Sequence, residues 1–390
     1  MASFKSDDSF LEKISIGAIG TKQVYKNLID LGHQPIELER GSMSYKIWKK
    51  IKIKRIRVPD ILLVDCGVRI ESRAKTKLEI SMSHSESDPT RGWDYGLKDS
   101  DLVALVVCSK EGEEPIDWKA DEVVQYVSVK ALREAAQNGS VDYVKPKGAE
   151  EGFEARITWP SAVASSDGTV IQIKDDRIQF SRASDNRTIS LSLKKKGIEI
   201  TPLVLAGEKI KQNQIIASSV PVQQDFTSIP VDESHFILNL NSTDLSDRYA
   251  ASKALSFFKS KNSEKALLER IADANEHIYV KLEAAASLAR FGKNDGYTFI
   301  EECLLKNDYA QNVLESVIVL AEIKSDKACQ ILATVLQDEK YGPEIRAGAA
   351  WALGEQNSKD SLSALVKSFN NVNELIKIEA ASVKNYKKTN

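Results

Sequence analysis

The stretch IRAGAAWALG, residues 345–354, decides the fold of the last third of the chain, because related stretches recur before it. They are RYAASKAL (248–255), KLEAAASL (281–288) and VLESVIVL (313–320), and the closing leucines of the four copies are 33, 32 and 33 residues apart. A weaker fifth copy is KIEAASV (377–383). A polar break and a second apolar segment, such as SLSALVKSF (361–369), follow each copy. This period predicts stacked helical hairpins, none of which can bury its apolar face alone.

These copies resemble HEAT-like repeats, particularly the short alanine-rich type first described in phycobilin lyases, over roughly residues 244–386. The small residues of each first helix let neighbouring helices approach closely, and each second helix buries its leucines. The resemblance implies an α-helical solenoid, which we assign to residues 240–390. It also implies a surface for a protein partner rather than a site of chemistry.

Composition sets outer limits on the class of protein. The 390 residues include 56 acidic and 54 basic side chains, so the average charge indicates neither a nucleic acid nor a membrane partner. No apolar run reaches the roughly 18 residues of a membrane-spanning helix, and the first residues lack the apolar core of a secretory signal. The four cysteines form no CxxC pair and the four histidines are scattered, which disfavours structural zinc and a disulfide framework. We therefore expect a multi-domain cytoplasmic protein.

The middle of the chain alternates polar and apolar residues. TVIQIK (169–174) and RIQF (177–180) flank Asp175 and Asp176, which predicts a β-hairpin. The series PLVLAGEKIKQNQIIA (202–217) resembles the barrel-sandwich hybrid of lipoyl domains and large RNA polymerase subunits, with Asn213 where that series has its second glycine. The resemblance implies a small all-β barrel or sandwich, assigned to residues 151–230, that is structural or faces nucleic acid. Lysines 194–196 form a charge run and not a lipoyl-attachment hairpin.

The N-terminal part carries the residues suited to chemistry. A helix is predicted from Thr21 to about Gly32, followed by the strands VPDILLV (58–64) and VRIESRAKTKLEIS (68–81). Because residues two apart share one face of a strand, Glu71, Arg73 and Lys75 should project together beside Asp60 of the preceding strand.

This arrangement resembles the PD-(D/E)xK nuclease core, which implies a restriction-endonuclease-like α/β domain over residues 1–150. By the resemblance, Asp60 and Glu71 hold Mg²⁺ or Mn²⁺, with Glu37, or alternatively Glu39, as a further ligand. The family has lysine two residues after the glutamate, whereas this chain has Arg73, which stays protonated and cannot be a general base. Arg73 and Lys75 are then expected to stabilise the charge of the transition state.

A basic run, YKIWKKIKIKRIR (45–57), precedes these acids. Seven of the twelve residues from 46 to 57 are Lys or Arg. The residues expected to contact DNA phosphates are Lys49, Lys50, Lys52, Lys54, Arg55 and Arg57.

Two functions compete. The first is a Mg²⁺-dependent endonuclease hydrolysing phosphodiester bonds in DNA, set by analogy in restriction or phage defence and compatible with a homodimer. The alternative is a non-catalytic nucleic-acid- or protein-binding scaffold with a degenerate nuclease fold. Metal-dependent DNA cleavage that is lost on substituting Asp60 and Glu71 would distinguish the two.

Overall fold

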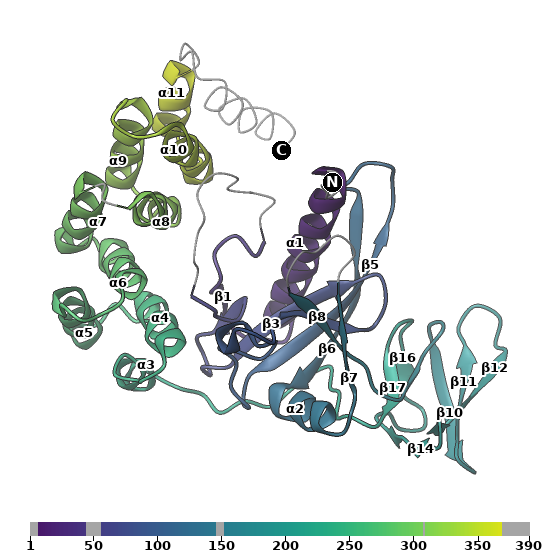
Figure 1. Ribbon diagram of the computed structural model, residues 1–390. Helices are drawn as coiled ribbons and strands as arrows, with labels where there is room; N and C mark the ends of the chain where they lie inside the picture. The colour runs from purple at the N-terminus through teal and green to yellow at the C-terminus, as the bar shows by residue number, and fades with distance from the viewer. Residues whose placement is uncertain (1–6, 44–55, 146–151, 307–308, 369–390) are drawn as a thin grey trace. The chain divides into compact units, whose positions relative to one another are not determined.

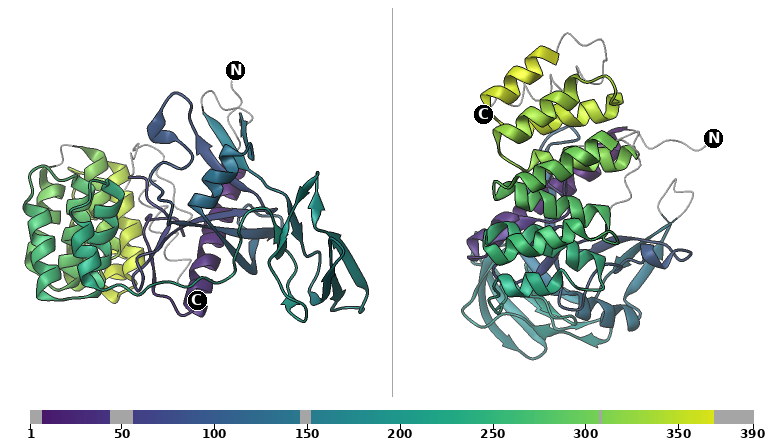
Figure 2. Two further views of the ribbon diagram at one scale, coloured as in Figure 1. Left: turned by 90° about the horizontal axis from the view of Figure 1, so that it is seen from below. Right: turned by 90° about the vertical axis from the view of Figure 1, so that its left-hand side faces the viewer.

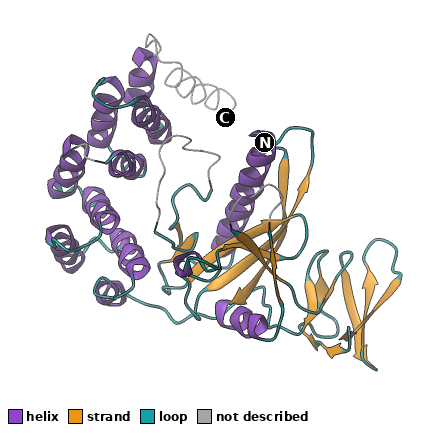
Figure 3. Ribbon diagram, in the orientation of Figure 1, coloured by secondary structure: helices purple, strands orange, loops and turns teal. Residues whose placement is uncertain are grey.

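The protein is described by a computed structural model that covers residues 7–43, 56–145, 152–306 and 309–368 (Figure 1). Its internal contacts divide the chain into two compact units. The first holds residues 7–43 and 57–231 and mixes helices with strands, while the second begins at Asp232 and is helical (Figure 3). The first unit therefore contains both the expected α/β region and the expected β region.

Helix α1 and a mixed five-stranded sheet form the framework of the first unit. The sheet has the order β1-β2-β3-β5-β6, in which β3 and β5 run parallel and the other neighbours run antiparallel. The bounds are α1 Asp7–Asp30, β1 Pro35–Glu37, β2 Ile61–Leu63, β3 Arg69–Lys75, β5 Leu102–Lys110 and β6 Trp118–Ser128.

The two faces of this sheet are covered differently. Val24 and Leu28 of α1 pack on one face, against a core that includes Ile61, Ile70 and Tyr126. The opposite face packs against helix α2 and a three-stranded sheet of order β4-β8-β7. Their bounds are α2 Val129–Gln137, β4 Ile80–His84, β7 Val141–Val144 and β8 Phe153–Ile157, and a 3-10 turn spans Pro89–Arg91.

Two expectations for this region are corrected. The helix begins at Asp7 and not at Thr21, whose hydroxyl donates to the carbonyl of Gly17 within the helix at 3.0 Å. The strand predicted over 68–81 is two strands, because β3 ends at Lys75 and β4 leaves to pair with β8 in another sheet. The predicted end of the helix is confirmed, since Gly32 takes the left-handed conformation (φ 89°) that favours glycine.

The rest of the first unit is β-rich. A four-stranded sheet of order β12-β11-β10-β16 and a three-stranded sheet of order β15-β17-β9 enclose a core that includes Val170, Phe180 and Ile216. The predicted hairpin is confirmed: Asp175 and Asp176 both have positive φ (52° and 56°), as a two-residue hairpin turn requires. The bounds are β9 Ser161–Val163, β10 Gly168–Lys174, β11 Arg177–Arg182, β12 Thr188–Ser192, β13 Lys194–Lys195, β14 Ile198–Glu199, β15 Thr201–Pro202, β16 Lys209–Ile210 and β17 Ile215–Ser218.

The second unit is a stack of helical hairpins that follow one another along the chain (Figure 2). The first helices of the hairpins coincide with the repeated stretches, so the predicted helical repeat is confirmed over the described residues; the fifth copy, 377–383, lies outside them. The bounds are α3 Glu233–Asn239, α4 Leu245–Ala254, α5 Lys261–Ala272, α6 Ile278–Arg290, α7 Asn294–Lys306, α8 Ala310–Ala321, α9 Asp326–Gln337, α10 Pro343–Gln356 and α11 Lys359–Ser368, with a 3-10 turn at Leu255–Phe257.

Small residues and buried polar bonds hold this stack together. Gly296 of α7 lies so close to α6 that a Cβ there would be 2.6 Å from the backbone nitrogen of Ala289. A charged ladder crosses three hairpins: Glu322, which follows α8, accepts from Lys253 of α4 at 3.0 Å and from Arg290 of α6 at 2.7 Å. The amide of Gln356 donates to the carbonyl of Leu320 in α8 at 2.7 Å and to that of Ile323, just after α8, at 2.8 Å. Each repeat is thus bonded to its neighbours as well as packed on them.

Candidate functional site

The structure brings Asp60 and Glu71 together on neighbouring strands. Strands β2 and β3 pair Ile61 with Ile70, so the next step along the ladder sets Asp60 opposite Glu71. The Asp60 carboxylate accepts a hydrogen bond from the backbone N–H of Ser72 at 2.7 Å. Both acids are buried, with 6% of Asp60 and 8% of Glu71 exposed. Two carboxyl groups with so little access to water need charge partners within the protein if they are to be ionised.

Arg73 supplies one of those partners. Its Nη2 forms an ion pair with Oε1 of Glu71, and its Nη1 donates to the carbonyl of Ser72 at 2.8 Å. The guanidinium therefore lies against the carboxylate that it was expected to assist. We call Asp60, Glu71 and Arg73 the carboxylate–arginine cluster.

Burial dominates the electrostatics of this cluster. Burial, and then the charges of Glu71 and Glu39, raise the pKa of Asp60 well above its usual value. Burial also raises the pKa of Glu71, although Arg73 and Arg57 oppose that shift. Removal from water disfavours the charged form of a carboxyl, and a second carboxylate nearby adds to the effect. The cluster therefore binds a proton more readily than exposed carboxylates do.

Other residues expected at the site are engaged elsewhere. The ammonium of Lys75 pairs with Glu154 of β8 at 3.1 Å, in a group that also includes Ser81. Although burial alone would raise the pKa of Glu154, hydrogen bonds from Ser81 and Lys75 outweigh it and lower that pKa to about 2. Glu37 accepts from the backbone N–H groups of Gly41 and Met43, both at 3.1 Å, so its carboxylate holds a turn.

The basic run is described at its end alone. Arg57 donates to the carbonyl of Gly92 at 2.7 Å, and its charge opposes the rise in the pKa of Glu71. The remaining residues expected to contact phosphates lie outside the described residues: Lys49, Lys50, Lys52, Lys54 and Arg55.

Sequence reasoning underrated one acid and missed an ion pair. Glu39 was the alternative to Glu37 as a metal ligand. Its negative charge contributes to the raised pKa of Asp60, Glu71 and Arg73. Arg69 of β3 and Asp101 form a buried pair with two contacts, at 2.6 and 3.0 Å. Residues 32 positions apart in sequence carry no spacing signal, so only the sheet register reveals this pair.

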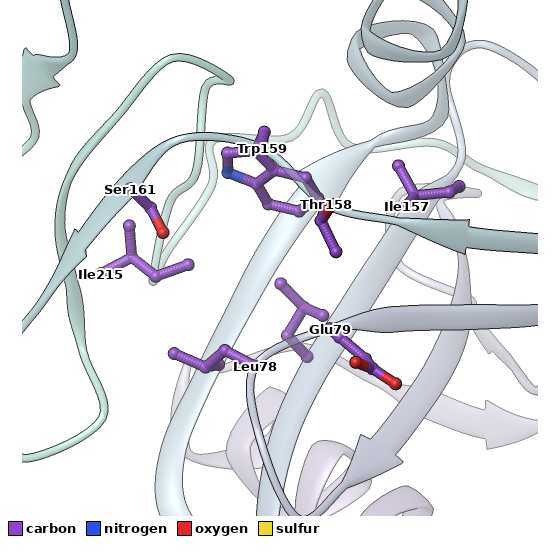
Figure 4. Close-up of a pocket in the computed structure, with 8 residues that line it drawn as sticks. Leu78, Glu79, Ile157, Thr158, Trp159, Ser161 and Ile215 are labelled. Atoms are coloured by element: carbon purple, nitrogen blue, oxygen red, sulfur yellow. The ribbon is translucent and has the colours of Figure 1, made fainter. Parts of the chain in front are cut away.

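A small pocket lies apart from this cluster in the first unit. Leu78, Glu79, Trp159 and Ile215 lie around it, with the Trp159 indole above the Leu78–Glu79 turn (Figure 4). The indole Nε1 is buried without a hydrogen-bond partner. Neither Asp60 nor Glu71 lines the pocket, so it adds no substrate space to the carboxylate–arginine cluster.

Comparison with known proteins assigns the repeats to a class. Residues 313–383 match the family model for HEAT repeats, so the C-terminal region contains HEAT-like repeats. Comparison with curated proteins gives no match.

Two solved structures are similar to parts of the chain. The complex of CpcE and CpcF of phycocyanin lyase from Nostoc sp. PCC7120 is 18% identical, with 41% of this chain and 66% of that chain covered and a TM-score of 0.29. Human deoxyhypusine hydroxylase in complex with glycerol is 11% identical, with 40% and 85% covered and a TM-score of 0.23.

These findings correct the predicted function. The Mg²⁺-dependent endonuclease, with its restriction or phage-defence setting, is wrong: the family model that matches the chain is that of HEAT repeats and not of a nuclease. No comparison supports a PD-(D/E)xK domain, and the observed architecture is a β-rich N-terminal region joined to HEAT-like repeats. The pairing of Arg73 with Glu71 and of Lys75 with Glu154 gives a physical reason, since both cations are already neutralised.

The structure also bears on whether a helix of this chain could span a membrane. Among the helices of the described residues, none combines the length and the apolar character that crossing a bilayer requires.

Proposed function

We propose that the chain is a non-catalytic scaffold whose HEAT-like array binds a protein partner. The observation that carries the proposal is the array itself: helices α4 to α11 form a bonded stack, and residues 313–383 match HEAT repeats. Stacked repeats present an extended surface on a rigid frame, which is how such solenoids bind other proteins. The similar lyase structure is itself named as a complex of two proteins.

The array offers apolar side chains that a partner could cover. Leu305, near the end of α7, is 66% exposed, and Tyr309, the residue before α8, is 71% exposed. Tyrosine is enriched among the residues that dominate binding energy at protein interfaces. We choose these two residues as the first positions to test, since neither contributes to the buried core of the stack.

A catalytic role for the carboxylate–arginine cluster is less favoured. Asp60 and Glu71 are almost fully buried, and Arg73 occupies one face of Glu71. Binding of Mg²⁺ or Mn²⁺ there stays a prediction, and the ion would need to displace Arg73. DNA binding likewise stays a prediction, because Arg57, the described member of the basic run, donates to the protein's own backbone. A homodimer and a cytoplasmic location stay predictions too.

The test is a binding measurement on the full chain. Partners captured from extract are purified, and their affinity is measured by calorimetry against wild type, Leu305→Glu with Tyr309→Glu, and Glu71→Gln. We expect the double variant to lose at least tenfold in affinity and Glu71→Gln to bind as wild type. Loss confined to Glu71→Gln, or no purified partner bound at tens of micromolar, a strength below about 7 kcal/mol, contradicts the proposal.

Duplex DNA serves as the competing ligand. Fluorescence anisotropy with a labelled duplex at low and physiological salt measures it directly, because phosphate contacts weaken steeply with salt. Tight, salt-dependent DNA binding without any protein partner would favour a nucleic-acid scaffold instead.

A further inference from the structure

Three side chains with metal-ligating atoms meet away from the carboxylate–arginine cluster. His33 follows the glycine that ends α1, and Asp65 and Cys66 occupy the turn between β2 and β3. Nδ1 of His33 lies 2.8 Å from Oδ2 of Asp65. One ring nitrogen, one carboxylate oxygen and the Cys66 sulfur all lie within 4.8 Å of one another. Within the part of the chain that the structure describes, this is the one such group of three His, Cys, Asp or Glu residues.

The surrounding structure holds each ligand in place. The ring of Phe226 stacks on the His33 ring, with centroids 5.0 Å apart and planes inclined by 10°. The second carboxylate oxygen of Asp65 accepts from the backbone N–H of Gln34 at 2.8 Å. The turn that carries Asp65 and Cys66 is closed by a 2.8 Å hydrogen bond from Gly67 N–H to the carbonyl of Leu63. Such outer contacts orient ligands and raise metal affinity.

The group is neither sealed from water nor freely exposed. The side chains of His33 and Asp65 are 11% and 29% exposed, and Cys66 is buried. A hydrogen-bonded clamp between His33 and Asp65 would explain those two residues by itself. It leaves unexplained why the Cys66 sulfur lies within 4.8 Å of both of those ligand atoms.

We propose that His33, Asp65 and Cys66 bind a zinc-type divalent transition metal, with water as the fourth ligand. Nitrogen, oxygen and sulfur donors together suit tetrahedral Zn²⁺, whereas Mg²⁺ and Ca²⁺ take oxygen ligands. Zinc bonds of about 2.0–2.3 Å set ligand atoms roughly 3.3–3.8 Å apart. Nδ1 of His33 and Oδ2 of Asp65 would therefore separate by up to about 1 Å, and the sulfur would close in. The thiol proton passes to water as the zinc–sulfur bond forms.

Sequence spacing concealed this site. Its ligands come as one histidine and, 32 and 33 residues later, an adjacent Asp-Cys pair, so no CxxC or HxxxH pattern exists. The ligands meet because β1 and β2 pair antiparallel, with Pro35 opposite Leu63. His33, just before β1, therefore lies beside Asp65 and Cys66, just after β2.

Metal binding by the full chain tests the proposal. The protein is stripped with a chelator under reducing conditions and titrated with Zn²⁺ against a chromophoric chelator, and separately with Co²⁺ as a spectroscopic probe. We expect one Zn²⁺ per chain and a sulfur-to-cobalt charge-transfer band in the near ultraviolet. Cys66→Ser, His33→Gln and Asp65→Asn should each weaken Zn²⁺ binding by at least about tenfold, the loss seen even for outer-contact changes. Cys108→Ser, another buried cysteine of the same unit, should bind as wild type.

A stability readout guards against misfolded variants. Zn²⁺ at about a hundred times its Kd should raise the Tm of wild type and Cys108→Ser by roughly 5–10 °C, but not that of Cys66→Ser. The proposal is overturned if wild type binds no Zn²⁺ under these conditions. It is equally overturned if Co²⁺ binds without the thiolate band, or if any one of the three ligand variants keeps wild-type affinity.

Discussion

Replacing Gly20 by alanine should push helix α1 away from strand β3. A Cβ at Gly20 would overlap the Cβ of Ala74 deeply and would lie 3.5 Å from the Ala74 Cα. Carbon atoms in contact are normally about 3.5–4.0 Å apart, so the helix and the strand must separate by on the order of 1 Å. Overpacking of this kind costs about 1–3 kcal/mol. Because β3 carries Glu71 and Arg73, the same shift disturbs the carboxylate–arginine cluster.

Gly17 provides a matched control one turn earlier on the same helix. A Cβ there meets no atom within 4 Å, so Gly17→Ala should stabilise the helix by up to about 1 kcal/mol through propensity alone. Because the gain in helix propensity is common to both substitutions, the two variants should differ by the overpacking cost alone, about 1–3 kcal/mol, which corresponds to roughly 2–12 °C in Tm for a unit of this size. Circular dichroism melting of the full chain measures the difference, as a shift in the unfolding transition of the first unit.

A second change checks the cause. Adding Ala74→Gly to Gly20→Ala removes the overlapping carbon and should recover more stability than Ala74→Gly loses by itself, which makes the two substitutions strongly non-additive. Equal stability of Gly20→Ala and Gly17→Ala would falsify the close approach of α1 and β3. Additive effects in the double variant would refute Ala74 as the obstacle.

Four further outcomes are expected, all measurable by melting the full chain. Gly296→Ala should cost the helical unit at least about 2 kcal/mol because the new Cβ meets backbone atoms of α6, whereas Gly342→Ala, with open space around it, should cost less than about 1 kcal/mol. Burial raises the pKa of Asp60, so its contribution to stability is present at low pH and lost as the pH rises; Asp60→Asn should therefore become more stable relative to wild type as the pH rises above about 4. Glu154 has a pKa lowered to about 2 despite its burial, so Glu154→Gln should destabilise at neutral pH and lose its effect as the pH falls toward about 2; the same slope for both variants would contradict the assignments. Glu322→Gln should destabilise the repeats by about 1–3 kcal/mol, since two partly buried cations each lose one carboxylate partner, and an unchanged transition would count against the ladder.

Local patterns in the sequence predicted most of the secondary structure. The repeats were predictable because the same apolar spacing occurs four times, and the hairpin because Asp175 and Asp176 suit its turn. The first half of α1 was not, because Gly17 and Gly20 disfavour a helix. Gly20 is there for its contact with Ala74, which is a tertiary reason that local propensity does not contain.

The site was predictable in position and not in charge balance. Strand alternation set Asp60 beside Glu71, but it could not show that Arg73 would pair with Glu71. Lys75 pairs with Glu154, 79 residues further along, through the pairing of β4 with β8. The function inferred from the motif was wrong for the same reason: a short motif specifies residue types, but it does not specify which acidic and basic side chains form ion pairs in the folded protein.

The bond from Lys253 to Glu322 reaches across an intervening hairpin. A purely nearest-neighbour stack can lose or gain a repeat without altering the contacts of the others. In this array, removal of the hairpin formed by α6 and α7 would take Arg290 away and leave Lys253 facing a different residue. The number of repeats between α4 and α8 is therefore constrained by charge as well as by packing. We also expect these hairpins to open as one cooperative unit, so that the hydrogen-exchange rates of their backbone amides increase together rather than one hairpin at a time.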